Sequence, residues 1–499
     1  MMLQQSAAMV VEQFARTLCL PSGAPPQHAV KPFLGALKQF TSRLCQLSNE
    51  KKGREVIAYQ LACSLALSVS TLVRLLKARC LPVLPKLVDA LLVFLAEASK
   101  LQPTGSEQNQ NKLVQVSMLR AMTSVAEHLP QFLIPHLDKL FSPAVLLPSF
   151  TIDEIDLVAT LAEKVPSRQL LPASGRALKK CSPASEISVL LNLTKASVEQ
   201  TSRGEIPDIG AVTGLVLQSI LHSCDFDTSL MEVANQVLLS LVMKLSEAQL
   251  RPVYAKLRVW RGDDNASRKF AFWSISSVLP KELKSIFLPC LSTAVDDVLQ
   301  ELDVAVSVLC TARKTKKTKV GTVESLQYLP ALLSCLGHCF AADAREGGSW
   351  IREDGEERYH LFMEPLSTLL LSRVLSNFPF ASGDVKDPYH ELIVQDGGLI
   401  TCLVALASAA GNDALWKPLN HAVLVACGNE DRVEIQRAGL TCLLKLMQTL
   451  GEEYMVLLPE CLPVLSELLE ADEGTAAIAR DCVEISEDLL GESLEDSFR

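Results

Sequence analysis

The chain has 499 residues, of which 48% are hydrophobic and only 5% aromatic, and its net charge is −10. This composition suits packed helices better than a β-sandwich, and the alternation typical of strands is scarce. The 15 cysteines are scattered through apolar runs without a CxxC pair. They argue against a disulfide framework and indicate small buried side chains in a reducing compartment.

The N-terminal part of the chain predicts helices with apolar faces. Residues 1–20 carry Glu12 and Arg16 where a signal peptide would be apolar, so we expect a helix there and not a leader. Val56–Val73 is long and free of charge, which leaves a membrane span open as one interpretation. Gln60 and four hydroxyl side chains within it favour the other, an inner helix covered by its neighbours.

Helix pairs led by proline recur along the chain. An apolar-faced helix followed by a proline-led helix is predicted in five stretches: 70–95, 113–140 with a break at Leu129 and Pro130 and a second helix led by Pro135, 231–257, 268–291 with Pro280 and Pro289, and 411–469. The spacing between leading prolines brackets the period of roughly 40 to 47 residues typical of HEAT and armadillo repeats. One helix pair cannot cover its own apolar face, so stacked neighbours must supply the core. The sequence therefore predicts an all-α fold, an α-solenoid of HEAT/armadillo-like helical repeats.

The densest positive charge lies between two predicted helices, in the stretch ARKTKKTKV. Its cationic residues are Arg313, Lys314, Lys316, Lys317 and Lys319. Two interpretations stay open: a solvated loop, or a patch that contacts RNA phosphates or serves nuclear import, since cationic side chains neutralise phosphates and release counterions. No aromatic residue interrupts the run, so base stacking is not indicated.

Recognisable motifs of catalysis are absent from the sequence. There is no phosphate-binding loop, dinucleotide fingerprint, nucleophile elbow or HExxH helix. Cys335, His338 and Cys339 share one predicted helix face and could offer three metal ligands. A fourth ligand at helical spacing is missing and apolar residues surround them, which favours buried packing. We expect no enzyme activity, no cofactor, no metal and no small-molecule substrate.

The stretch from Gly411 to Leu469 contains the clearest helix pair. Asn429 and Asp431 are expected to cap the first helix and Gly451 to end it, and the second helix is expected from Tyr454 to Glu470. The predicted apolar face of the first helix consists of Val433, Leu440, Leu443, Leu444, Met447 and Leu450.

A candidate partner anchor lies at the entry to this stretch. It comprises Trp416, Lys417 and Asn420. A large flat side chain at a helix junction either fills the core or stands on the surface to hold a partner, and both alternatives stay open.

The end of the chain is strongly acidic. From Glu470 onward there are ten acidic residues against two arginines, so most of the net charge lies there. This end is either a solvated capping helix or a docking surface for a basic partner.

Three stretches of the sequence resemble one protein family. The first is RLLKARCLPVLPKLVDALL (74–92). The second is QVLLSLVMKLSEAQLRPVYAKLRVW (236–260), with LHSCDFDT upstream and the helix from Leu279 to Phe287 downstream. The third is DALWKPLN (413–420), followed by LGEEYMVLLPECLPVLSELLE (450–470) and LLGESLEDSF. Together they are similar to the C-terminal part of the HEAT-repeat protein of the small-subunit processome, which is associated with the U-three small nucleolar RNA. Family members are several times longer than this chain. HEAT units also usually place an arginine where Gln436 stands.

The resemblance implies a non-enzymatic scaffold in the nucleus and nucleolus that acts in pre-rRNA transcription and small-subunit rRNA processing. Its implied partners are other processome proteins, together with small nucleolar RNA and pre-rRNA, and no membrane. It also implies HEAT-like repeats over 1–205, a family-specific helical domain over 206–360, and C-terminal HEAT repeats with an acidic capping end over 361–499. Two alternatives stay open: a generic HEAT-repeat adaptor in cytosolic transport or cytoskeletal assembly, and an enzyme whose site is assembled from scattered residues.

Overall fold

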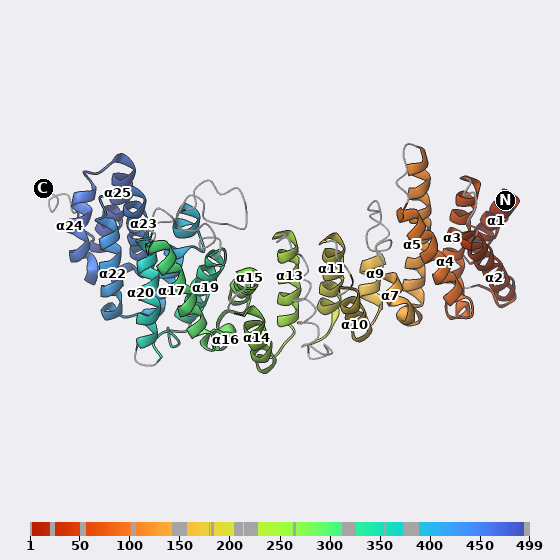
Figure 1. Ribbon diagram of the computed structural model, residues 1–499, viewed down its shortest axis with the longest axis horizontal. Helices are drawn as coiled ribbons and strands as arrows, with labels where there is room; N and C mark the ends of the chain where they lie inside the picture. Colours follow the sequence, from red (N-terminus) through yellow and green to blue (C-terminus); the bar gives the residue numbers. More distant parts are fainter. Residues whose placement is uncertain are drawn as a thin grey trace. The chain divides into compact units, whose positions relative to one another are not determined.

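The computed structural model describes residues 2–19, 25–49, 56–100, 106–141, 157–178, 180, 184–203, 213, 228–262, 266–311, 326–353, 356–372 and 389–493. Every regular element in these ranges is a helix (Figure 1). The chain separates into two compact units, Met1–Leu245 and Ser246–Arg499. The three-part division over 1–205, 206–360 and 361–499 stays a prediction.

The first unit is a double row of helices. In one row each helix packs on the next: α1 (Met2–Cys19), α3 (Val56–Leu76), α5 (Ser106–His128), α9 (Leu157–Lys164), α11 (Ala184–Gln200) and α13 (Thr228–Val242). The other row holds α2 (Gln27–Asn49), α4 (Leu84–Lys100), α6 (Pro130–Leu133), α7 (Leu137–Leu140) and α10 (Ser167–Leu178). Short 3-10 helices, η1 (Lys77–Cys80) and η2 (Ile134–His136), lie at the bends between the rows.

The second unit repeats this arrangement. One row consists of α15 (Ala266–Leu283), α19 (Leu329–Arg345), α21 (Leu399–Ala410), α23 (Val433–Leu450) and α25 (Glu473–Leu490). The other contains α17 (Val295–Thr311), α20 (Glu357–Leu370), α22 (Asp413–Cys427) and α24 (Leu458–Leu468), and α14 (Glu247–Arg261) packs on α15 and on α16 (Leu288–Ser292). The remaining elements are η3 (Lys284–Phe287), the π-helix η4 (His390–Val394) and η5 (Gly451–Leu457). Because each helix pair is covered by its neighbours, the fold is the predicted α-solenoid of HEAT-like repeats.

Local sequence explains where many helices begin and end. The predicted break at Leu129 and Pro130 is present, but the next helix, α6, begins at Pro130 itself, and Pro135 lies inside η2. Helices α16 and α24 also have proline in their first turn. Proline suits this position because the first turn of a helix needs no backbone donor. Helix α23 ends at Gly451, where φ is 55°, a backbone conformation that glycine adopts readily.

Several predicted boundaries were wrong. Asn429 and Asp431 do not cap α23, because residues 428–432 form a turn before the helix begins. The N-cap residue is Arg432, and its side chain makes no capping hydrogen bond. The second helix is shorter than predicted, since a 3-10 segment occupies Gly451–Leu457 before α24 begins. Pro280 does not separate two helices, because it lies inside the last turns of α15.

The predicted apolar face of α23 was partly wrong as well. Leu440, Leu443 and Met447 are buried, but Val433 is 41% exposed. Leu444 and Leu450 are only half-buried, whereas Ile435 and Leu446 are buried, so the buried stripe is rotated relative to the predicted one.

In the part of the chain that the structure describes, two helical stretches are long and apolar enough to cross a membrane, Tyr59–Cys80 and His390–Ala410. In both, most of the apolar window is buried inside the protein, 72% and 61% respectively. The first includes most of α3, which packs between α1 and α5. This burial is typical of the central helices of a solenoid.

Candidate functional site

Two of the three candidate metal ligands of α19 lie in a packed interior, and the third, His338, is half-buried. Cys335 and Cys339 are fully buried, and His338 Nδ1 lies 2.6 Å from the backbone oxygen of Ser334. Burial raises the pKa of Cys339 well above its usual value, so this thiol stays protonated. Within the described ranges, no group of three or more His, Cys, Asp and Glu side chains could hold a metal ion.

Two of the three candidate anchor residues of α22 are buried. Trp416 is only 4% exposed, and its indole Nε1 donates a hydrogen bond to the backbone oxygen of Ala407 in α21, at 2.8 Å. Asn420 is 1% exposed, whereas Lys417 is exposed. The burial favours the core alternative for Trp416 and Asn420, and a role for Lys417 in partner binding stays a prediction.

Asn420 is the centre of a buried polar cluster that joins α22 to the following helices. Its side-chain oxygen accepts a hydrogen bond from the hydroxyl of Tyr454 at 2.5 Å, and its amide nitrogen donates to Glu460 at 3.2 Å. The thiol of Cys461 lies 3.7 Å from the same oxygen. Burial raises the pKa of Tyr454, which keeps its hydroxyl a donor. The cluster fixes the register between α22, η5 and α24.

The basic run of Arg313, Lys314, Lys316, Lys317 and Lys319 lies outside the described residues. Its suggested roles in RNA contact or nuclear import stay predictions.

Exposed carboxylates cover the last two helices, α24 and α25. We call this set the acidic surface, and its exposed members in the described chain, on these helices and beside their ends, are Glu460, Glu467, Glu470, Asp472, Glu473, Asp481, Glu484, Asp488 and Glu492. Asp472 caps α25 by accepting from the backbone nitrogens of Gly474 and Thr475, and its carboxylate also pairs with Arg437 of α23 at 2.5 Å. The hydrogen bonds from Thr475 and Arg437 lower the pKa of Asp472 to about 2. Most of the other carboxylates remain available to solvent or to a partner.

A buried charge network lies where α14, α15 and α17 meet. Glu301 is 2% exposed and pairs with Lys269 at 2.9 Å and with Arg261 at 3.6 Å. Asp297 pairs with Arg258 at 2.7 Å and with Arg261 at 3.5 Å. Arg261 is 4% exposed and lies over the ring of Phe272. Because such charges are stable in a core only when they are paired, the network ties the three helices together.

Sequence reasoning missed this network. Its partners lie far apart in the chain, and only the packing of α14 and α15 against α17 brings them together. One feature of the sequence could have indicated the network: Glu301 shares a helix face with Val298, Leu302 and Ala305, and this face is buried. A charged residue on such a face needs a partner of opposite charge.

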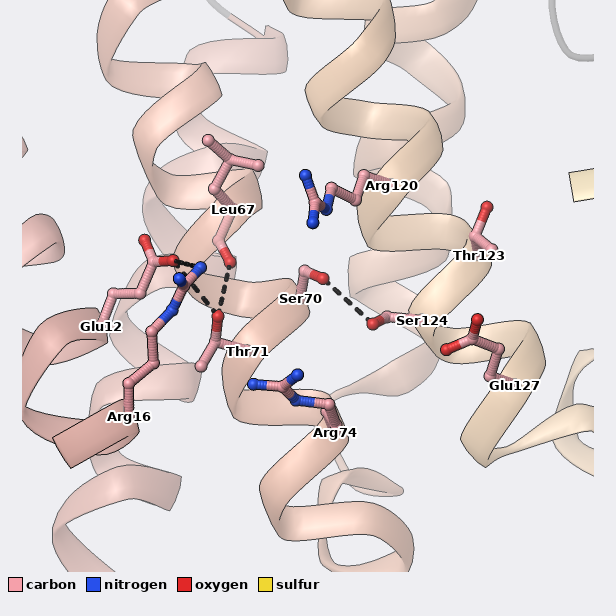
Figure 2. A pocket seen from close by; sticks show the side chains of 10 residues that line it. All are labelled: Glu12, Arg16, Leu67, Ser70, Thr71, Arg74, Arg120, Thr123, Ser124 and Glu127. Atoms are coloured by element: carbon pink, nitrogen blue, oxygen red, sulfur yellow. Dashed lines mark hydrogen bonds and ion pairs between the residues drawn. The ribbon is translucent and has the colours of Figure 1, made fainter. Parts of the chain in front are cut away.

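A polar pocket of about 300 Å³ opens on the face of three successive helices in the first unit (Figure 2). Arg16 and Glu12 come from α1, Arg74 from α3, and Arg120 and Glu127 from α5. The remaining lining residues are Leu67, Ser70, Thr71, Thr123 and Ser124. Sequence reasoning also missed this site, because its arginines belong to different repeats.

Comparison with known proteins shows similarity to one group of HEAT-repeat proteins. The BP28CT (NUC211) domain matches residues 227–347, a range that contains the buried charge network. HEAT repeat-containing protein 1 of Homo sapiens is 25% identical over 94% of this chain and 21% of its own length. U3 small nucleolar RNA-associated protein 10 of Schizosaccharomyces pombe is 24% identical over 86% of this chain and 24% of its own length.

A further relative, an uncharacterized protein of Arabidopsis thaliana, is 28% identical over 81% of this chain and 19% of its own length. Among solved structures, importin beta aligns with a TM-score of 0.41 and 13% identity over 96% of this chain and 60% of that one. This chain spans 19% to 24% of the length of these curated relatives. Over most of its length the chain is similar to HEAT repeat-containing protein 1 and to U3 small nucleolar RNA-associated protein 10, and its central part matches the BP28CT (NUC211) domain.

Proposed function

We propose that the chain is a non-enzymatic scaffold of the small-subunit processome, the U3 small nucleolar ribonucleoprotein, and acts in pre-rRNA transcription and small-subunit rRNA processing. The observation that carries this proposal is the extent of the similarity. Relatives named for their association with U3 small nucleolar RNA match 86% and 78% of this chain, in Schizosaccharomyces pombe and Yarrowia lipolytica. A similarity of this extent involves both compact units and not a single repeat.

The architecture supports a scaffold. Double rows of helices present long faces on which several proteins can dock at once. Cys335 and Cys339 of α19, two of the candidate metal ligands, are buried in the core. A generic cytosolic adaptor would share the helix rows, but no specific observation favours it.

We further propose that the partners are processome proteins, with small nucleolar RNA and pre-rRNA bound directly or through the complex, and that the protein resides in the nucleolus. The acidic surface of α24 and α25 suits a partner protein rich in lysine and arginine, because opposite charges speed association and select against acidic partners. The run Arg313–Lys319 suits RNA phosphates.

Depletion of the endogenous protein tests the function. We expect the mature small-subunit rRNA to fall and its unprocessed precursor to accumulate, with a smaller and later effect on the large subunit. Precursor hybridisation and pulse labelling measure both. Re-expression of the chain is the control for specificity. Normal precursor levels after efficient depletion, with a tagged protein outside the nucleolus, would contradict the proposal. The alternative of a generic HEAT-repeat adaptor would then be favoured.

A further inference from the structure

The pocket on α1, α3 and α5 holds two arginines whose charge is not used inside the protein. Arg16 is bound by Glu12, which also accepts a hydrogen bond from Thr71 at 3.3 Å. In contrast, Arg74 and Arg120 are exposed and make no hydrogen bond or ion pair with any described residue. Figure 2 shows the three arginines arranged around the hydroxyls of Ser70 and Thr71. Like charges held near one pocket favour an anion as its occupant.

The hydroxyl groups of the pocket add donors beside the guanidinium groups. Ser70 of α3 donates to Ser124 of α5 at 3.0 Å, and this bond leaves the proton of Ser124 for another acceptor. Both serines are about nine-tenths buried, with 9% of each exposed. The pocket therefore offers two planar guanidinium groups and a fixed hydroxyl donor from two neighbouring helices. A phosphate group has the matching chemistry, since its oxygens accept paired hydrogen bonds from arginine.

The other charges in the pocket select the kind of molecule that carries the phosphate. Glu12 and Glu127 are also part of the lining. They would repel the adjacent phosphates of an RNA strand, and the lining contains no aromatic side chain on which a base could stack. A single phosphate on a polypeptide avoids this repulsion, and the backbone donors of the peptide can bind the two carboxylates.

We propose that this pocket binds a phosphorylated serine or threonine side chain of a partner protein. Arg74 and Arg120 bind the phosphate, Ser124 donates a third hydrogen bond, and Glu12 and Glu127 accept from the flanking peptide. The scaffold would then hold this partner only after a kinase has modified it, because arginine clusters distinguish the doubly charged phosphate from a neutral hydroxyl.

Binding of the full chain to peptide pools tests the proposal. The probes are fluorescent short peptides with a central phosphoserine or phosphothreonine and degenerate flanks, the unphosphorylated twin pool, and a single-stranded RNA of comparable charge. Fluorescence anisotropy measures each affinity. We expect the phosphorylated pool to bind, the unphosphorylated pool to bind at least about tenfold more weakly, and inorganic phosphate to compete.

The variant pair Arg74→Gln and Arg120→Gln assigns the binding to the pocket. Together they should weaken phosphopeptide binding by about tenfold or more, as the loss of two charge-assisted contacts requires. Lys86→Gln with Arg168→Gln removes the same charge from exposed positions on other helices and should leave binding unchanged. All four side chains are exposed, so both double variants should keep the circular dichroism spectrum and melting curve of the parent. Equal binding of the two peptide pools, undiminished binding by the Arg74 and Arg120 variant, or tighter binding of the RNA than of the phosphopeptides would overturn the proposal.

Discussion

Replacing Trp416 by alanine should destabilise the α21–α22 helix pair and not merely release a partner. The ring is only 4% exposed, and its nitrogen donates to Ala407 at 2.8 Å. Removal of a buried tryptophan costs about 3 to 5 kcal/mol, because it leaves a cavity as well as losing apolar burial. Trp416→Phe keeps most of the ring but loses the hydrogen bond, for which we expect about 1 kcal/mol. Lys417→Ala is the matched control on an exposed neighbour and should change stability by about 0.5 kcal/mol or less.

Hydrogen exchange followed by mass spectrometry measures this effect locally. A solenoid of many repeats need not unfold in one step, so a single melting temperature could hide the change. Amides of α21 and α22 that exchange by opening of the pair should exchange roughly two to four orders of magnitude faster in Trp416→Ala, following the cost given above. If Trp416→Ala exchanges at the same rate as Lys417→Ala and also loses a partner protein, the assignment of Trp416 to the core is refuted. Trp416 would then be a surface anchor for that partner.

Three further predictions concern charged groups. Glu301→Gln removes the buried negative charge that pairs with Arg261 and Lys269, so the free energy of unfolding of the second unit, measured by chemical denaturation, should fall by about 3 to 5 kcal/mol. An unchanged free energy of unfolding would contradict a stabilising role for the network. The pKa of Asp472 is lowered to about 2 in the fold, so its contribution to α25 is present above about pH 4 and is lost as pH falls toward 2. Circular dichroism should therefore show acid fraying that Asp472→Asn reduces, and an identical acid profile in both proteins would count against it. Neutralising the five charges of Arg313–Lys319 should weaken RNA binding and also reduce its dependence on salt concentration. Filter binding at several salt concentrations measures both effects. Unchanged binding would indicate that these residues form a solvated loop or serve nuclear import.

The sequence predicted the fold well because the decisive signals are local. Pro130 and Gly451 mark real helix boundaries, since a missing backbone donor and a left-handed backbone act on their own turn. The cap at Asn429 failed for the same kind of local reason. A turn of a few residues separates it from α23, and the composition of that turn does not fix its length.

The candidate sites were less predictable because they depend on packing between repeats. The sequence could not decide whether Trp416 is core or surface, since both alternatives fit a tryptophan at a helix junction, and the decision came from the position of Ala407 in the preceding helix. Similarly, Arg74 and Arg120 are ordinary exposed arginines until stacking of α3 on α5 places them in one pocket.

The central claim is that this chain is part of the U3 small nucleolar ribonucleoprotein, and affinity purification of the tagged chain tests it most directly. The tagged chain, expressed at endogenous level, is recovered from cells, and U3 small nucleolar RNA is quantified against an unrelated small nucleolar RNA and against a tagged helical-repeat protein of the cytosol. The account predicts selective enrichment of U3 RNA and of pre-rRNA together with processome proteins. Recovery of U3 RNA no higher than that of the two controls, from a chain that folds and is expressed, would contradict it.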